Sequence, residues 1–319
     1  MKNRKFMAPI FGVIFSFFLV DIAKSEENLW LYTTGTDTRP QGSFEAKFTD
    51  IMMKGKSSGK YVRHEMRGGL EYGLTDKLTV GASLLVFKHD YSVKNPDLDP
   101  MYGTQGGEGG KVNHTAIGGY QLMTKYNILS PYKDPIGVSV GFTYDTREKY
   151  RLDGADINQK SYITRLFLQK NWLDDKLVLA VNGVTELERR KAEGEVLEEE
   201  IAFEVMAGLS YRVLPKHFIG VEWRPQRDHL TPTEQGESLN PGHQQSNWDL
   251  NDISVGANHQ YANYFGPTYH YAEKNWWATV GALWQVSGGG KAGRGVGNDG
   301  KNWDEHERVH IGLVTGYEF

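Results

Sequence analysis

The chain has 319 residues, with 36 Lys and Arg against 40 Asp and Glu, a formal net charge of −4, and no cysteine. The lack of cysteine excludes disulfides, thiolate catalysis and Cys-ligated metal or iron–sulfur sites. The acidic balance gives no electrostatic reason to expect nucleic acid as a partner. Residues 295–300 match G-x-G-x-x-G, but no helix or βαβ unit follows, so we expect no cofactor.

The first 25 residues have the three parts of a secretory signal peptide. Residues 2–5 are basic, residues 6–20 form an apolar run, and residues 23–25 (Ala-Lys-Ser) offer a small-x-small cleavage site. An uncleaved membrane anchor is the alternative, but the run is short and contains Pro9 and Gly12. We therefore expect export, and an exported chain without cysteine indicates a Gram-negative envelope.

Residues 26–42 stand apart from the rest of the chain. The apolar stretch Leu29–Tyr32 is followed by polar residues before the first predicted strand begins near Ser43. Two placements are open for this segment, in the periplasm or inside the lumen of a barrel as a partial plug. Inside a lumen, Trp30 and Tyr32 are the natural contacts for an apolar or aromatic solute.

From residue 43 to residue 319, apolar and polar residues alternate with period two, and helical periodicity is nearly absent. In residues 135–146, for example, Ile136 and Val138 share one face while Gly137 and Ser139 share the other. The same pattern recurs in residues 77–86, 201–213 and 309–319. It is typical of strands in a sheet whose two faces meet different surroundings.

The connections between these segments predict the architecture. Short turns are expected near Leu74–Asp76, Ser130–Asp134, Leu173–Asp175, Pro215–Lys216 and Ala272–Lys274. Longer polar segments are expected around Gly55–Gly59, His89–Lys111, Thr146–Asp156, Arg189–Glu195, Arg227–Ala257 and Ser287–Asp304. Strict alternation of short and long connections is typical of outer-membrane barrels. We therefore predict that residues 43–319 form a transmembrane antiparallel up-and-down β-barrel of about twelve strands, with both termini periplasmic.

An aromatic residue is expected near the short-turn end of every second strand, in the outward phase. The six are Tyr72, Tyr126, Trp172, Tyr211, Tyr271 and Tyr317. Tyr and Trp favour the membrane interface, where an apolar ring meets headgroups and a polar tip meets water. The row predicts an aromatic girdle at the membrane–water interface on the periplasmic side of the barrel.

Several segments resemble known outer-membrane proteins. The last strand ends in Tyr317-Glu318-Phe319 and is similar to the C-terminal signal of bacterial outer-membrane proteins, which implies insertion by the outer-membrane assembly machinery. Residues 33–45, 70–84 and 265–271 resemble uncharacterised outer-membrane barrels described as porins or transporters, including those placed near aromatic-degradation pathways. The resemblance implies the fold and the compartment, and it supplies no substrate and no catalytic residue.

The inward phase of the predicted strands carries charges of both signs. The candidates for the lumen lining are Arg67, Glu71, Lys125, Asp145, Arg147, Arg165, Gln169, Glu204, Arg212, Glu222, Arg224, His310 and Glu318. Two interpretations are open. The charges form an eyelet that selects solutes by size and charge, or they pair across the lumen and fill it.

An enzyme is not expected. The histidines His114, His270 and His310 prompt a search for a hydrolase site, but no G-x-S-x-G motif occurs. Carboxylates gather in the predicted loops, among them Asp97, Asp99 and Asp304, without the spacing of an EF-hand. We therefore assign no catalytic or metal-binding residues.

The sequence predicts a narrow channel in the outer membrane that lets small solutes pass passively. The alternative is a closed barrel that acts structurally or binds partners through its external loops, chiefly residues 89–111 and 227–257. The expected surroundings are the lipid bilayer and lipopolysaccharide, and a small-molecule solute is the expected partner.

Overall fold

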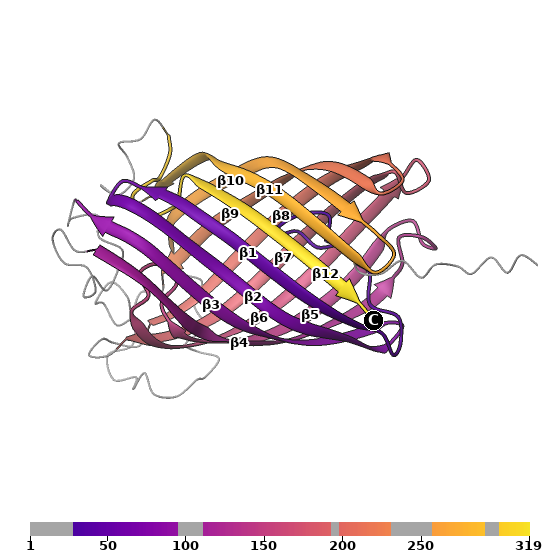
Figure 1. Cartoon of the computed structure of the whole chain (residues 1–319), viewed down its shortest axis with the longest axis horizontal. Coiled ribbons are helices and arrows are strands. Elements are labelled where there is room, and N and C mark those ends of the chain that lie inside the picture. Colours follow the sequence, from indigo (N-terminus) through magenta and orange to yellow (C-terminus); the bar gives the residue numbers. More distant parts are fainter. Residues whose placement is uncertain (1–27, 95–110, 193–197, 231–256, 291–299) are drawn as a thin grey trace, which may run out of the picture.

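The computed structural model describes residues 28–94, 111–192, 198–230, 257–290 and 300–319, and these form a closed barrel of twelve antiparallel strands (Figure 1). Each strand pairs with its neighbours in the sequence, and the first pairs with the last. The strands are β1 (Phe44–Lys56), β2 (Gly59–Thr75), β3 (Leu78–Val93), β4 (Lys111–Leu129), β5 (Gly137–Lys149), β6 (Asp156–Trp172), β7 (Leu177–Ala192), β8 (Glu198–Leu214), β9 (His217–Leu230), β10 (Ala257–Ala272), β11 (Trp276–Gly290) and β12 (Val309–Glu318). The predicted closed antiparallel up-and-down barrel of about twelve strands is confirmed, and the periplasmic placement of both termini stays a prediction.

Some of the predicted segments are not described by the structure. The predicted signal peptide lies outside the described residues, as do most of the two loops expected to bind partners. Within the described residues there is no helix long and apolar enough to cross a membrane.

The period-two pattern decides which side chains face the lumen. On β5, Val140 and Phe142 are about 40% exposed on the outer wall, whereas Ser139 and Thr143 are buried inside. The outer wall is therefore apolar along the strands, while much of the inner wall is polar. A sheet with this polarity suits a barrel surrounded by lipid, because closure leaves no unpaired strand edge in the apolar phase.

The two ends of the barrel differ in their connections. One end, here the turn end, carries the β2–β3, β4–β5, β6–β7, β8–β9 and β10–β11 turns together with Phe44 and Phe319. The opposite end, here the loop end, is where β1 leads to β2, β3 to β4, β5 to β6, β7 to β8, β9 to β10 and β11 to β12. In Figure 1 the C-terminus marks the turn end.

One predicted long connection is wrong. Residues 55–59 are not a loop, because β1 and β2 are joined by Ser57 and Ser58 alone. Gly55 and Gly59 lie within the two strands with positive φ angles of 85° and 153°, a conformation that glycine tolerates best. The glycines therefore make a tight hairpin, and the strict alternation of short and long connections fails at this position.

Residues 28–42 lie inside the barrel at its turn end. Trp30 and Leu31 are among the most buried side chains of the protein, at 1% and 5% exposure. Leu31 packs with residues of β1 and β10–β12, and Trp30 packs on Val178 and Ala180 of β7. Of the two placements that the sequence left open, the structure shows the lumenal one.

Two segments fold into the loop end. The backbone of residues 150–155 is bound by two tyrosines. Tyr61 donates a hydrogen bond to the carbonyl of Leu152 (2.7 Å), and Tyr91 donates one to the carbonyl of Asp153 (3.1 Å). Residues 300–308 lie nearby, with Asn302 and Glu307 buried. The lumen is therefore narrowed from both ends.

Candidate functional site in the barrel lumen

A cavity of about 330 Å³ remains in the lumen, between the N-terminal segment at the turn end and the two inward-folded segments at the loop end. Strands β1 to β9 provide its wall, and Asn28, Leu31, Tyr32 and Thr34 border it from the N-terminal segment. Charged side chains dominate its lining. The cations are Lys47, Arg63, Arg67, Lys125, Arg147, Arg151, Arg165 and Arg224, and the carboxylates are Glu65, Glu71, Asp145, Glu186 and Glu204.

Eight of the thirteen residues predicted to face the lumen border this cavity. These are Arg67, Glu71, Lys125, Asp145, Arg147, Arg165, Glu204 and Arg224. The strand phase was therefore a good guide to side-chain direction. The remaining five lie elsewhere.

Arg212 is one of these exceptions. It lies at the turn end of β8, where its guanidinium donates a hydrogen bond to the carbonyl of Asp174 (3.0 Å) and lies 5.8 Å from the ring centroid of Phe218. The phase of Arg212 is inward, but its height along the barrel axis places it beside a turn. Arg212 therefore does not border the cavity, and its place in the lumen lining stays a prediction.

Glu222 and His310 face inward but are covered by the N-terminal segment. The hydroxyl of Tyr32 shares a hydrogen bond with Nδ1 of His310 (2.8 Å). Both Glu222 and His310 are completely buried. Gln169 accepts a hydrogen bond from the backbone N–H of Thr36 (2.8 Å). Glu318 lies 3.6 Å from Arg39. These four residues hold the segment and do not border the cavity.

The carboxylate of Glu222 binds the N-terminal segment with three hydrogen bonds. It accepts the backbone N–H groups of Leu31 (2.9 Å), Tyr32 (2.9 Å) and Thr33 (2.5 Å). Hydrogen bonds to an ionised carboxylate are stronger than those between neutral groups, at about 1.5–3 kcal/mol each. Because the segment has no secondary structure there, Glu222 supplies the acceptors that its backbone needs.

The contacts of the segment continue around the inner wall. Thr34 exchanges two hydrogen bonds with the side-chain amide of Asn182 on β7 (2.7 and 2.8 Å). The carbonyl of Thr36 accepts from Ser139 on β5 (2.5 Å), and Arg39 forms an ion pair with Glu45 on β1 (3.1 Å). The segment thus crosses the turn end from β9 to β1 and obstructs it.

Trp30 and Tyr32 differ in their position relative to the cavity. The Trp30 indole packs against Gly208, where an added Cβ would lie 2.4 Å from the ring, so it faces the wall. Tyr32 borders the cavity, and the guanidinium of Arg224 lies 4.0 Å from its ring centroid. Of the two residues proposed to contact a solute, the geometry keeps only Tyr32 as a candidate.

Some of the cavity charges are paired. Arg67 binds Glu65 at 2.7 Å, Arg147 binds Asp145 at 3.3 Å, and Lys47 binds Glu71 at 3.3 Å. Among the described residues, no carboxylate oxygen lies within ion-pair distance of Arg165 or Arg224. Arg165 donates a hydrogen bond to Thr143 Oγ1 (2.9 Å), and Nε and Nη1 of Arg224 are buried without a hydrogen-bond partner.

Several cavity residues were not predicted. Arg63 and Glu65 follow from continuing the inward phase of Arg67 along β2. Glu186 is harder to find, because the alternation on β7 is interrupted by a run of charged residues. Arg151 lies in a loop that folds inward, and no periodic signal marks such a residue.

A second group of charges lies at the loop end. Glu307, in the segment before β12, is buried within 3.4 Å of Arg63 and 3.6 Å of His310. Burial alone would raise the pKa of the Glu307 carboxyl, but the positive charges of Arg63 and Lys56 and the neighbouring imidazole of His310 together hold this pKa well below its usual range. The cluster joins residues 300–308 to β2 and β12.

The predicted histidine candidates do not converge. His270 on β10 shares a hydrogen bond with Thr279 (2.8 Å), His310 contacts Glu307 and Tyr32, and His114 is exposed on β4. The described residues contain no group of three His, Asp or Glu side chains arranged to hold a metal ion.

The aromatic residues of the predicted girdle all lie near the turn end on the outer wall. Tyr126, Trp172, Tyr211 and Tyr317 are 41–54% exposed, and Tyr72 and Tyr271 are partly exposed. The rings of Phe44 and Phe319 stack with a centroid distance of 6.1 Å at the same end. Their contact with headgroups stays a prediction.

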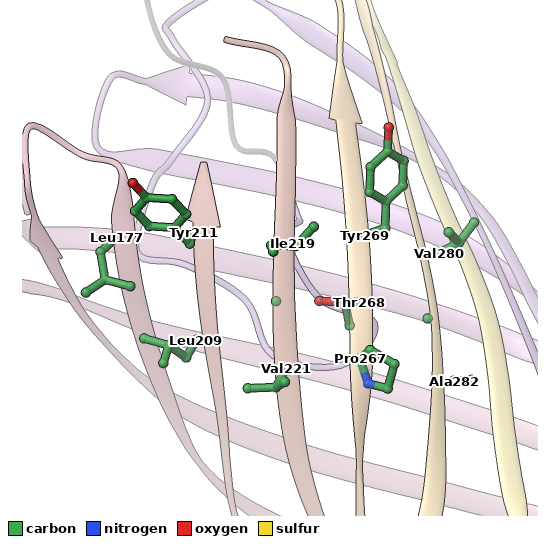
Figure 2. Close-up of a pocket in the computed structure, with 12 residues that line it drawn as sticks. Leu177, Leu209, Tyr211, Ile219, Val221, Pro267, Thr268, Tyr269, Val280 and Ala282 are labelled. Atoms are coloured by element: carbon green, nitrogen blue, oxygen red, sulfur yellow. The ribbon is translucent and has the colours of Figure 1, made fainter. Parts of the chain in front are cut away.

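The outer wall also has an apolar groove of about 740 Å³ over β7–β11 (Figure 2). Pro267 in the middle of β10 has no N–H to donate, and Leu209, Val221 and Val280 line the groove around it. These outer-wall side chains point away from the charged cavity. In a membrane, lipid chains would fill this groove, so it is separate from the candidate site.

No curated protein matches the sequence. Among solved structures, the chain is similar to the COG4313 outer membrane channel from Pseudomonas putida F1, with a TM-score of 0.55, 12% identity, and coverage of 89% of this chain and 98% of the other. It also aligns with the KdgM porin in complex with disordered oligogalacturonate, with a TM-score of 0.43, 10% identity, and coverage of 86% and 99%.

The first of these likenesses shows a shared fold, and the second is too distant to support an argument. A family model described as a family of unknown function, DUF6662, matches residues 22–319. This match spans the N-terminal segment and all twelve strands. The chain therefore belongs to the DUF6662 family.

Proposed function

We propose that this protein is an outer-membrane channel for small polar solutes, and that residues 28–42 close it at the turn end. The observation that carries the proposal is the internal cavity lined by charges of both signs. Charged rings in a confined lumen are the usual means by which channels select solutes. The name of the similar barrel, an outer membrane channel, supports the same role.

The N-terminal segment accounts for the closed state. Its contacts with β9, β7, β5 and β1 hold it across the turn end by hydrogen bonds and an ion pair. Such contacts can exchange for water, so the segment can leave the lumen without breaking the barrel wall. Solute passage then depends on this displacement.

The second candidate is the closed structural or surface-binding barrel. The observation in its favour is that the described segments narrow both ends of the lumen and that three ion pairs lie along the cavity wall, within one strand or between adjacent strands. In this case the interior stabilises the barrel, and function belongs to the external loops. The main loops concerned, residues 95–110 and 231–256, lie outside the described residues.

The membrane setting completes the proposal. Residues 1–25 direct export, the outer-membrane assembly machinery recognises the strand that ends in Phe319, and the turn end faces the periplasm. The aromatic row at that end contacts headgroups, and the loop end meets lipopolysaccharide. The apolar outer wall of the barrel and the inward fold of residues 28–42 from the turn end support this orientation.

Single-channel conductance in a planar bilayer tests the proposal. The mature chain, residues 26–319, is compared with a variant lacking residues 28–41, after both are shown to fold by heat-modifiable migration on a gel. We expect brief openings of the mature chain and larger, longer openings of the variant, because the obstruction is absent. Two folded barrels that both stay silent would contradict a channel and favour the structural alternative.

A further inference from the structure

The charge around the cavity is not balanced. Eight cationic side chains and five carboxylates border it among the described residues, and one of the cations, Arg63, pairs with Glu307 just outside the lining. Two cations remain in excess, whereas the whole chain carries a net charge of −4. Charged groups withdrawn from bulk water need a nearby opposite charge or hydrogen-bond partners. An excess of positive charge in a confined space therefore favours an anion as the occupant.

Arg165 and Arg224 locate this excess. Arg165 on β6 pairs in register with Val184 on β7, which pairs with Glu204 on β8, so Arg165 and Glu204 lie two strands apart on one inward row with an apolar residue between them. Arg224 on β9 borders the same cavity. Glu204 interacts electrostatically with both guanidinium groups, and it has further interactions of its own. Glu186 and Asp145 also attract Arg165, but the positive charge of Arg67 acts on Arg165 and that of Arg151 acts on Arg224. Positive charge therefore remains around the two guanidinium groups.

Both guanidinium groups also have hydrogen-bonding capacity left. Each has five N–H donors arranged as a planar fork, and the described contact of Arg165 with Thr143 uses one of them. Arg224 stacks on Tyr32, and its Nε and Nη1 have no partner. The fork matches the two oxygens of a carboxylate, which accepts two parallel hydrogen bonds.

We propose that Arg165 and Arg224 bind a small organic carboxylate in the lumenal cavity. The proposal rests on the proposed function, because it names the class of solute for the same cavity. The size of the site limits that class. A cavity of about 330 Å³ lies at the small end of the range for small-molecule sites, which suits a small acid.

Equilibrium dialysis with radiolabelled succinate tests the assignment. The mature chain is refolded in detergent micelles with succinate present from the start, so that binding does not depend on opening of the N-terminal segment. Succinamide, which has the same carbon skeleton without the charge, is measured in parallel, as is inorganic phosphate. We expect saturable binding of succinate at one site and none of succinamide.

Variants identify the residues. Arg165→Gln and Arg224→Gln are each expected to weaken succinate binding about ten- to hundredfold, the effect of losing one charge-assisted interaction. Arg165→Lys keeps the charge but loses the fork, so a smaller loss is expected. Arg212→Gln is the matched control, because Arg212 faces inward at the turn end away from the cavity, and it should bind like the parent protein.

Three outcomes would overturn the inference: no saturable binding of succinate, binding of phosphate alone, or succinate binding that is unchanged in both glutamine variants. Each is read on barrels shown to be folded. The result is independent of conductance. A protein that binds succinate through Arg165 and Arg224 but never conducts would refute the channel and leave the binding site, whereas a conducting barrel that binds no succinate would refute the site alone.

Discussion

Glu222 is the residue on which the placement of the N-terminal segment most depends. One side chain accepts three consecutive backbone N–H groups, from Leu31, Tyr32 and Thr33. A glutamine at this position has the same shape but only one acceptor oxygen, and its NH₂ group would face an N–H donor. We therefore expect Glu222→Gln to loosen the segment while leaving the barrel closed by its strands.

Proteolysis measures how far this substitution loosens the segment. Losing about 2 kcal/mol raises the population of the released segment roughly 30-fold, and chymotryptic cleavage after Tyr32 follows that population when release is fast. Cleavage of folded Glu222→Gln should therefore be about 30 times faster than that of the parent chain. Glu186→Gln is the control, because Glu186 borders the cavity from β7 and makes no described contact with the segment. Equal rates in Glu222→Gln and the parent would show that Glu222 does not hold the segment.

Glu307 provides a pH-dependent contribution to stability at the loop end. Its folded pKa lies well below its unfolded value, because Arg63, Lys56 and His310 together outweigh the effect of burial, which alone would raise it. A depressed pKa stabilises the folded state above the unfolded pKa of about 4.3, and this stabilisation is lost as the pH falls toward the folded pKa. At neutral pH we expect Glu307→Gln to lower the free energy of unfolding by about 3 kcal/mol, since it leaves Arg63 buried without its carboxylate.

Denaturant unfolding of the refolded barrel, measured from pH 7 to pH 3, checks this expectation. The difference between the parent and Glu307→Gln should be constant down to about pH 5 and then shrink with further acidification. Lys60→Gln is a suitable control, because its ion pair with Asp90 is largely exposed and contributes little. A difference that stays constant to pH 3 would contradict the assigned role of Glu307.

The strands were the predictable part of the structure. Alternation in segments such as residues 135–146 gave both the strand and the direction of its side chains, because period two is a local property of an extended backbone. Arg165 and Arg224 were therefore placed on the inner wall from sequence alone. Height along the axis was not accessible in the same way, since it depends on register with neighbouring strands. Arg212 shows the consequence, as its phase is inward but it lies beside a turn.

The connections were less predictable. The cluster of Lys, Ser and Gly at residues 55–59 has the composition of a loop, but the positive φ angles of Gly55 and Gly59 allow a hairpin turn of two residues. The inward fold of residues 150–155 depends on Tyr61 and Tyr91, which are distant in sequence. Short-range patterns do not reveal contacts of this kind.

The N-terminal segment was predictable in one respect and not in another. Its composition set it apart from the barrel, but the sequence could not choose between the periplasm and the lumen. Its backbone donates hydrogen bonds to the side chains of Glu222 and Asn182, and the bonded residues are 191 and 148 positions apart along the chain. Glycines complete the fit, since an added Cβ at Gly208 or Gly312 would lie within 3 Å of the side chains of Trp30 and Leu31. Such complementarity exists only once the barrel has closed.

For the whole molecule, the structure combines an apolar outer wall, a charged cavity and a segment that closes one end. The central claim is that movement of this segment controls passage through the barrel. A reversible disulfide tests it most directly, because the chain has no cysteine of its own. An added Cβ at Gly137 would lie 2.4 Å from Thr36 Oγ1 and 2.8 Å from Pro131 Cδ, so cysteines at positions 36 and 137 are close enough to join the segment to β5 once Pro131 shifts slightly.

The measurement is the single-channel conductance of the double variant Thr36→Cys/Gly137→Cys in a planar bilayer, oxidised and then reduced in place. Thr36→Cys alone serves as the control for the reductant. The account predicts a silent channel when the disulfide is formed and recovery of the parent conductance when it is reduced. Equal conductance in the two states, or silence in both, would contradict the claim that the segment opens the barrel.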